Sequence, residues 1–141
     1  MKNLKGFTLL EIIIVVILLS IIAGFAIPSY NKSMRRTHEQ DAVVQLTALH
    51  VANELYEAQA DQYLQGAGLS LTQVNNGLHI SIMANEMTYS YTSGAGSYAA
   101  TSSWNETGTS HDFTLRVNQT TISSSNPCCS AGTCPTVANC S

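Results

Sequence analysis

The chain has 141 residues, of which 45% are apolar and only 11% are charged, and its formal net charge is −3. This length allows one ordinary domain, or a small domain with an appendage. The apolar residues gather in one run of membrane length, which argues against a compact cytosolic enzyme. Beyond Arg36 the chain has eight carboxylates and one basic residue, Arg116, so it lacks the basic stripe needed to bind nucleic acid.

The apolar run covers residues 7–27 and contains a single charged side chain, Glu11. As an α-helix rising ~1.5 Å per residue it would span ~32 Å, close to the ~30 Å hydrocarbon core of a bilayer. Because it is apolar on every side, it is predicted to be a membrane span or a fully buried helix. A cleaved signal peptide, cut near residues 24–26, is a third interpretation, but the run is too long and the carboxylate is atypical.

Basic residues flank the run on both sides. Lys2 and Lys5 precede it, and Lys32, Arg35 and Arg36 follow it. We expect the second group to face lipid head groups. The two flanks are nearly balanced, so the positive-inside rule does not decide the orientation in the membrane.

Glu11 is the unusual residue of the run. A carboxylate near the centre of a membrane span costs about 2.5–3.5 kcal/mol. Glu11 lies near one end, so its side chain could reach the head groups. The alternative is that the carboxylate awaits a cationic partner in another chain.

The start of the chain, from Lys2 to Glu11, reads KNLKGFTLLE. It resembles the processing site of type IV prepilins and pseudopilins, in which a short basic leader ends in Gly. The resemblance implies that a membrane prepilin peptidase removes the leader, residues 1–6, by cutting between Gly6 and Phe7, and then methylates the amino group of Phe7. Glu11 becomes the fifth residue of the mature chain, where the family keeps its Glu.

The resemblance also gives Glu11 a role. In the family's filament model, the Glu of an incoming subunit pairs with the Phe amine of its neighbour. Inside an apolar bundle, leaving either charge unpaired is costly, so such a pair would fix the axial register of the subunits.

One helix is predicted from about Phe7 to about Tyr63. Its first part, residues 7–28, is the membrane and filament-core half. Its second part, residues 29–63, is amphipathic, with a mainly apolar stripe at Leu46, Leu49, Asn53, Tyr56, Ala60 and Tyr63. Gly24 and Pro28 mark a weak point, which is either a simple kink or, by family analogy, a segment that unwinds when subunits leave the membrane.

Residues 64–141 are predicted to form a polar, β-rich head. About half of these residues are Ser, Thr, Asn or Gly. Leu64–Gly77 is expected to be a loop, and residues 93–96 and 117–119 are expected to be hairpin turns. The strand-like runs are His79–Met83, Met87–Thr92, Ser97–Ser103, Asp112–Val117 and Thr120–Ser123. They predict an antiparallel meander of three to five strands, with one face on the helix.

Four cysteines, Cys128, Cys129, Cys134 and Cys140, lie close together near the end of the chain. They lack the paired C-x2-C spacing of a zinc ribbon, so disulfides are favoured over a metal site. Two pairings remain open: 128–134 with 129–140, or 128–140 with 129–134. Disulfides need an oxidising compartment, which places the amino end in the cytoplasm and the head outside.

No other chemistry is predicted. The histidines His38, His50, His79 and His111 follow no metal-binding pattern, and no nucleophile elbow, P-loop or paired-carboxylate pattern is present. We therefore expect no catalytic residue, no cofactor and no metal, and the chain is not predicted to be an enzyme.

Together these features predict an α+β protein with the type IV pilin fold: a long N-terminal helix packed on a small antiparallel sheet, with a disulfide-tied C-terminal loop. The resemblance implies a filament subunit, with a major pilin favoured over a minor pilin or a type II secretion pseudopilin with a binding head. Its implied partners are its own copies in a helical filament, the prepilin peptidase and an inner-membrane assembly platform. The precursor would cross the inner membrane once, and the filament would be extracellular.

Overall fold

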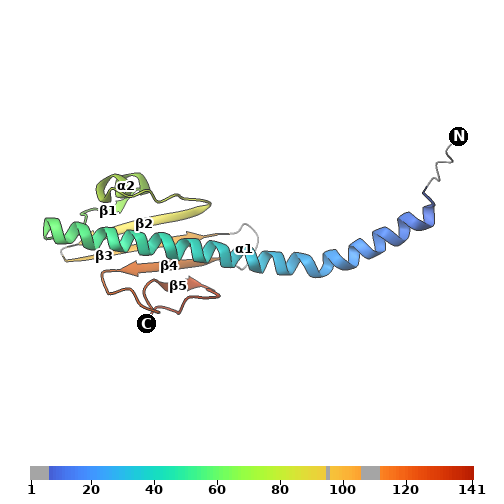
Figure 1. Ribbon diagram of the computed structural model, residues 1–141. Coiled ribbons are helices and arrows are strands. Elements are labelled where there is room, and N and C mark those ends of the chain that lie inside the picture. Colours follow the sequence, from blue (N-terminus) through green and yellow to red (C-terminus); the bar gives the residue numbers. More distant parts are fainter. Residues whose placement is uncertain (1–6, 95, 106–111) are drawn as a thin grey trace. The chain divides into compact units, whose positions relative to one another are not determined.

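The computed structural model describes residues 7–94, 96–105 and 112–141. The chain forms two compact units, Met1–Arg35 and Arg36–Ser141, which are described separately below. The long helix comes first along the chain, and a head made of a short helix and a β-sheet follows it (Figure 1). The second unit includes the last part of the long helix as well as the head.

The long helix, α1, runs from Leu9 to Ala60, close to the predicted limits. Thr8 caps its start, because the backbone N–H of Glu11 donates to the Thr8 carbonyl at 3.1 Å and to its hydroxyl at 3.3 Å. Its end is set by Asp61, which has a left-handed φ of 56° and donates its N–H to the carbonyl of Glu57.

The sheet has five antiparallel strands in the order β1-β2-β3-β4-β5. They are β1 (Ala67–Leu69), β2 (Met87–Gly94), β3 (Ser97–Trp104), β4 (Phe113–Asn118) and β5 (Cys128–Gly132). Because each strand pairs with the next in sequence, the predicted meander is confirmed. β2 and β3 form the hairpin expected at residues 93–96, with Gly94 opposite Ser97 and a left-handed Gly96 between them.

The segment Leu64–Gly77, predicted as a loop, instead contains β1 and a short helix, α2 (Leu71–Leu78). A capping box starts this helix. The Ser70 hydroxyl accepts from the Gln73 backbone N–H, and the Gln73 side chain accepts from the Ser70 backbone N–H. The two reciprocal bonds stabilise the first turn of α2, which the Asn and Gly residues of the segment would otherwise disfavour.

Two predicted strands are also absent from the sheet. In His79–Met83 the backbone of Ile82 pairs with the side-chain amide of Asn75, at 2.9 and 3.0 Å, in place of a neighbouring strand. In Thr120–Ser123 the carbonyl of Thr120 accepts from the Asn126 side chain. The turn expected at residues 117–119 is wrong as well, because β4 continues to Asn118 and a longer connection leads to β5.

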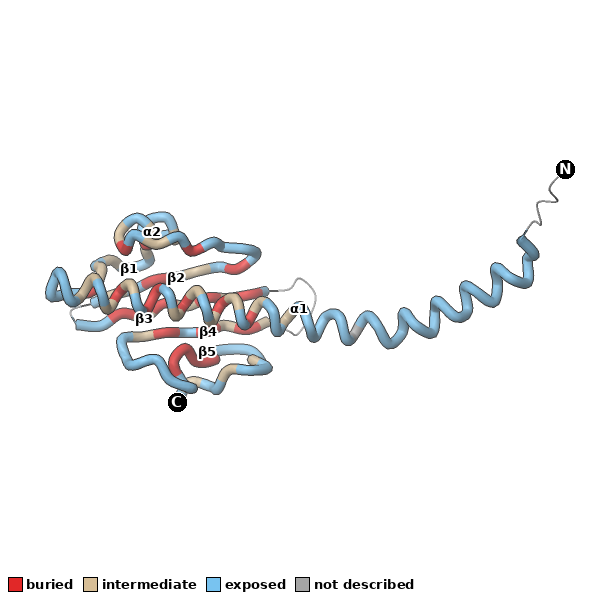
Figure 2. Tube along the Cα trace, viewed as in Figure 1, coloured by how far each residue is buried: buried red, intermediate tan, exposed pale blue. Residues whose placement is uncertain are grey.

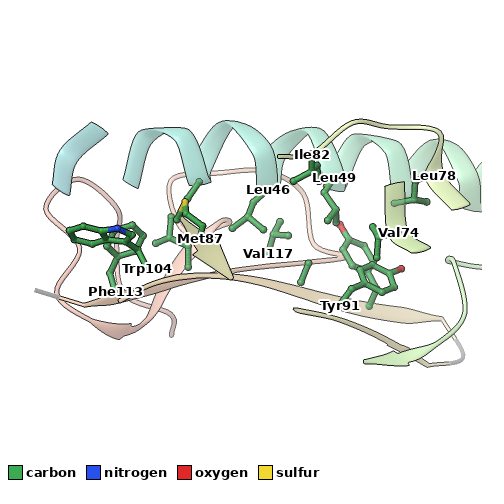
Figure 3. Packing of buried hydrophobic residues seen from close by; sticks show 14 of the residues in the cluster. Leu46, Leu49, Val74, Leu78, Ile82, Met87, Tyr91, Trp104, Phe113 and Val117 are labelled. Atoms are coloured by element: carbon green, nitrogen blue, oxygen red, sulfur yellow. The ribbon is translucent and has the colours of Figure 1, made fainter. Parts of the chain in front are cut away.

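The core lies between α1 and one face of the sheet, within the second unit (Figure 3). Leu46 and Leu49 of α1 are buried on the helix side, and Tyr91 and Leu115 on the sheet side. β4 alternates buried and more exposed residues as predicted. Full burial of a residue such as Leu46 contributes about 1.5–3 kcal/mol, so this layer fixes the head onto the helix.

Candidate functional site

The first site feature is the apolar segment, residues 9–27 of α1. Every large apolar side chain in it is at least 44% exposed, and Figure 2 shows the tube here in the colour of exposed residues. A window of this helix has a mean hydropathy of 2.9 with none of it buried, and among the described residues this is the one helix whose length and composition suit a membrane crossing. The described residues of the first unit thus present a long, exposed apolar surface.

Glu11 is the acidic residue of the first turn of α1. A negative charge at this position interacts favourably with the helix dipole. Among the described residues, its carboxylate has no ion-pair partner. The helix geometry therefore holds one carboxylate next to an exposed apolar surface, where a cation from elsewhere could pair with it.

The predicted processing residues lie just before the helix. Phe7 precedes α1 and is 74% exposed, whereas Gly6 lies outside the described residues. The cleavage and methylation of this junction stay predictions.

Both residues of the predicted helix break lie inside α1, which is helical at Gly24 and at Pro28. Proline has no backbone N–H, so the carbonyl four residues earlier loses its usual intrahelical donor. That carbonyl belongs to Gly24, where a side chain would meet no other part of the described structure within 4 Å. Pro28 thus removes one hydrogen bond from the helix, at the turn that begins with Gly24.

The C-terminal loop, residues 128–140, is closed by two disulfides. Cys128 bonds Cys140, and Cys129 bonds Cys134, which is the second of the two pairings that the sequence left open. All four thiols are consumed, because no cysteine is free. Among the described residues no group of three His, Cys, Asp or Glu side chains could hold a metal ion.

Glu39 attaches the C-terminal loop to α1. Its fully buried carboxylate accepts hydrogen bonds from the backbone N–H of Thr136, at 3.0 and 3.2 Å, and from that of Val137, at 3.0 Å. Hydrogen bonds to an ionised group are among the stronger ones. Sequence reasoning missed this contact, although Glu39 lies three residues before Ala42, on the buried face of the helix.

Two histidines of α1 pack inside the head. His38 stacks on Trp104 with ring centroids 4.8 Å apart. His50 is buried, and its Nδ1 lies within hydrogen-bond distance of the Tyr98 hydroxyl and, at 3.1 Å, of the Asn118 carbonyl. His79 is the left-handed C-cap of α2, and His111 lies outside the described residues. These contacts are structural.

Two buried tyrosines, Tyr91 and Tyr98, contact the C-terminal part of α1. Burial raises the pKa of Tyr91 to about 12, and its hydroxyl donates to the Asn53 side chain at 2.7 Å and to the Leu64 carbonyl at 3.0 Å. Burial also raises the pKa of Tyr98 well above its usual range. Both phenols therefore stay neutral at ordinary pH, which suits packing.

The comparisons with known proteins agree with the predicted resemblance. Residues 1–27 match the family model described as the prokaryotic N-terminal methylation motif. The chain is 37% identical over 59 residues to the type IV major pilin protein PilA of Myxococcus xanthus (strain DK1622), covering 42% of this chain and 27% of that protein. It is 38% identical over 77 residues to a fimbrial protein of Pseudomonas aeruginosa, covering 55% of this chain and 50% of that protein.

A third relative is the type II secretion system core protein G of Vibrio cholerae serotype O1 (strain ATCC 39315 / El Tor Inaba N16961), with 35% identity over 63 residues, 45% of this chain and 43% of that protein. The matches thus span between about a quarter and half the length of these curated relatives. No solved structure matches the chain. The long helix, the antiparallel sheet and the C-terminal disulfides agree with the type IV pilin fold.

Proposed function

We propose that this chain is the structural subunit of a type IV pilus-like filament. The observation that carries the proposal is the exposed, membrane-length apolar helix, which begins with the methylation motif and continues into a polar head. An apolar surface of this length is covered by lipid before assembly and by neighbouring subunits afterwards. The chain supplies structure in this role and acts as no enzyme.

Processing prepares the subunit for assembly. The prepilin peptidase cuts between Gly6 and Phe7 and methylates the new amino group of Phe7. The resulting ammonium and the Glu11 carboxylate are opposite charges at the same end of the helix. Pairing Glu11 of an incoming subunit with the amine of a neighbour avoids an unpaired charge inside an apolar bundle.

The cellular location of the subunit follows from its membrane-length helix and from the disulfides of its head. The precursor crosses the inner membrane once, with its amino end in the cytoplasm. The two disulfides of the head, such as Cys128–Cys140, form in the oxidising space outside. An inner-membrane assembly platform then moves the subunit into an extracellular filament made of copies of the same chain.

Within this function a major pilin is the first candidate, because relatives that match the chain are named major pilin, major fimbrial or fimbrial proteins. A pseudopilin is the second candidate, since core protein G of a type II secretion system matches over a similar length. Abundance separates the two, because a major pilin dominates the mass of sheared surface filaments.

Mass spectrometry of filaments sheared from the producing cell tests the proposal. We expect the subunit to start at a methylated Phe7 and to be the main component. A Gly6→Val variant should keep its leader and yield no filament, while a Ser29→Ala variant, altered at an exposed helix position, should be processed normally. Secreted material that begins at Ile27, as after signal-peptide cleavage, would overturn the proposal.

A further inference from the structure

The outer face of the sheet, which points away from α1, carries a single basic residue among its described positions. β4 buries every second residue in the core, and Arg116 lies between two of these, Leu115 and Val117, so its side chain is exposed on the outer face. Within the described residues its guanidinium forms no ion pair and no hydrogen bond. Arg116 is also the one basic residue beyond Arg36, so this face holds an unpaired positive charge in an otherwise acidic sequence.

Arg116 borders a hollow beside the β2–β3 hairpin, which we call the hairpin hollow. The hollow forms because Ala99, with a single methyl group, lies between two larger residues, its strand partners Thr92 on β2 and Asn118 on β4. Its volume is about 270 Å³, just below the ~300–1,000 Å³ of typical small-molecule sites, so one small unit would fill it. The residues that line it include Thr92, Ser97, Ala99, Arg116, Asn118 and Gln119.

Hydrogen-bond donors in this lining lack partners within the described residues. The side-chain oxygen of Asn118 accepts from the backbone N–H and the hydroxyl of Thr120, at 3.1 and 2.6 Å, whereas its NH2 group makes no hydrogen bond there. The side chains of Gln119 and Ser97 make none either. The described lining contains no carboxylate, so the hollow presents a positive charge and free donors to a ligand.

We infer that the hairpin hollow binds a carboxylated sugar, namely a uronic acid unit of an acidic polysaccharide. The carboxylate fits the planar fork of Arg116, which donates two parallel hydrogen bonds to such a group. The ring and hydroxyl oxygens of the sugar accept from the amide groups of Asn118 and Gln119. The hydroxyl of Ser97 donates to, or accepts from, the remaining sugar hydroxyls.

The charge and polarity of the hollow favour this ligand over three others. A neutral sugar leaves the guanidinium without its counter-charge, and an apolar ligand leaves every donor of the lining unpaired. A doubly charged phosphate brings one negative charge more than Arg116 can balance, into a chain whose carboxylates outnumber its basic residues. One carboxylate with several neutral oxygens matches the lining best.

The outer face next to the hollow suits the rest of a polysaccharide chain. Along the β2–β3 pair the outward residues after Thr92 and Ala99 are Ser90 with Thr101 and then Thr88 with Ser103. All four bear hydroxyls and no charge, so further sugar units find hydrogen-bond partners and no repulsion there. The hollow lies within one subunit, so the inference goes beyond the proposed function and does not rest on it.

Ligand-observed NMR on the full-length, detergent-solubilised chain tests the inference, with glucuronate as the probe. The detergent should have a polyoxyethylene head group, because a sugar head group would compete. We expect glucuronate to bind with a dissociation constant on the order of 1 mM, and glucose, which lacks the carboxylate, to bind about tenfold more weakly or less. Glucuronate that does not bind, or that binds no better than glucose or inorganic phosphate, overturns the inference.

Three variants locate the site. Arg116→Gln should weaken glucuronate binding by about tenfold without changing that of glucose, and Arg116→Lys, which keeps the charge and loses the fork, should fall between Arg116→Gln and the wild type. Ala99→Leu fills the hollow and should abolish binding with Arg116 intact. The matched control is Lys32→Gln, an exposed basic residue of the first unit, which should bind as the wild type does.

Wild-type affinity for glucuronate in Arg116→Gln or in Ala99→Leu overturns the inference, provided that thermal unfolding shows a folded head. None of these binding results depends on filament assembly, so the proposed function would stand. A wild-type chain that forms no filament contradicts the proposed function and leaves the binding measurement valid.

Discussion

The buried carboxylate of Glu39 lies 3.0 Å from the backbone nitrogen of Thr136, which is 97 residues further along the chain. This contact joins the long helix to the disulfide-closed loop, with a side chain as the acceptor and the loop backbone as the donor. A buried carboxylate needs such donors, because an unpaired charge in the core is strongly unfavourable. The loop is therefore part of the packing of the head as well as its C-terminal surface.

Glu39→Ala should destabilise the head. The variant removes a charged acceptor and leaves the N–H groups of Thr136 and Val137 without their partner, at a cost of about 2–3 kcal/mol. Glu39→Gln keeps one acceptor and should cost less. Denaturant unfolding of the detergent-solubilised chain measures both, with the exposed Glu86→Gln as control. A Glu39→Ala chain within about 0.5 kcal/mol of wild type would show that the contact contributes nothing.

The disulfide pairing predicts that removing both cysteines of one bond lowers stability less than removing one cysteine from each bond. Removing both cysteines of one bond, as in Cys128→Ser with Cys140→Ser, should cost about 2–4 kcal/mol because the unfolded chain gains freedom. Removing Cys128 together with Cys134 breaks both bonds and should cost clearly more. Thiol titration of the folded chains should find no free thiol in the first variant and two in the second. The reverse result, two free thiols in the first variant and none in the second, would show the other pairing.

Gly132→Ala should disrupt the edge of the sheet. Gly132 has a left-handed φ of 80°, and a Cβ there would lie 2.0 Å from the carbonyl oxygen of Asp112 and 2.8 Å from Cα of Phe113. Neither backbone atom can move without shifting β4, so we expect a loss of about 2 kcal/mol or more. The control is Gly94→Ala, where the nearest atom is 3.8 Å away. Thermal unfolding measures both, and similar melting temperatures would contradict the strain.

The periodicity of apolar residues in the sequence predicted those helices and strands that depend on residues close together in the chain. The long helix follows from its apolar run and stripe, and β4 follows from the alternation of Phe113, Leu115 and Val117. The capping box at Ser70 is also local, so α2 could have been found by giving more weight to Gln73 three residues later.

Other features depend on residues far apart in the chain. β5 joins the sheet through pairing with β4, and its short run around Cys129 has no alternating pattern of its own. The burial of Glu39 depends on donors near the other end of the chain. The groove between α1 and Gly77–Ile80 needs α2 to pack beside the long helix, so its shape could not be read from the sequence.

Alkaline pH should destabilise the head through its buried tyrosines. Burial raises the pKa of Tyr91 from about 10 in the unfolded chain to about 12 in the folded one. The neutral Tyr91 phenol therefore contributes fully to the free energy of unfolding below pH 10. About 2–3 kcal/mol of this stability is lost as the pH rises from 10 through 12. Tyr98 acts in the same direction.

Unfolding free energies measured between pH 8 and 12 should show this loss. Tyr91→Phe should flatten the decline, because its phenol no longer ionises, while lowering stability at pH 8 by about 1 kcal/mol through its lost hydrogen bonds. Tyr30→Phe, at an exposed position in the first unit, should leave the curve unchanged. A stability that stays constant up to pH 12 would contradict the prediction.

Glu11→Gln should separate membrane insertion from assembly. The variant keeps the size of the side chain and removes a charge that is costly in the bilayer, so insertion and cleavage before Phe7 should be unaffected or improved. Assembly should fall by about tenfold or more, because the amine of a neighbouring Phe7 then enters an apolar bundle without its partner. Glu11→Asp keeps the charge and should restore part of the yield, which a purely steric role of the side chain would not predict. Filaments of Glu11→Gln at wild-type yield would show that the carboxylate has no part in assembly.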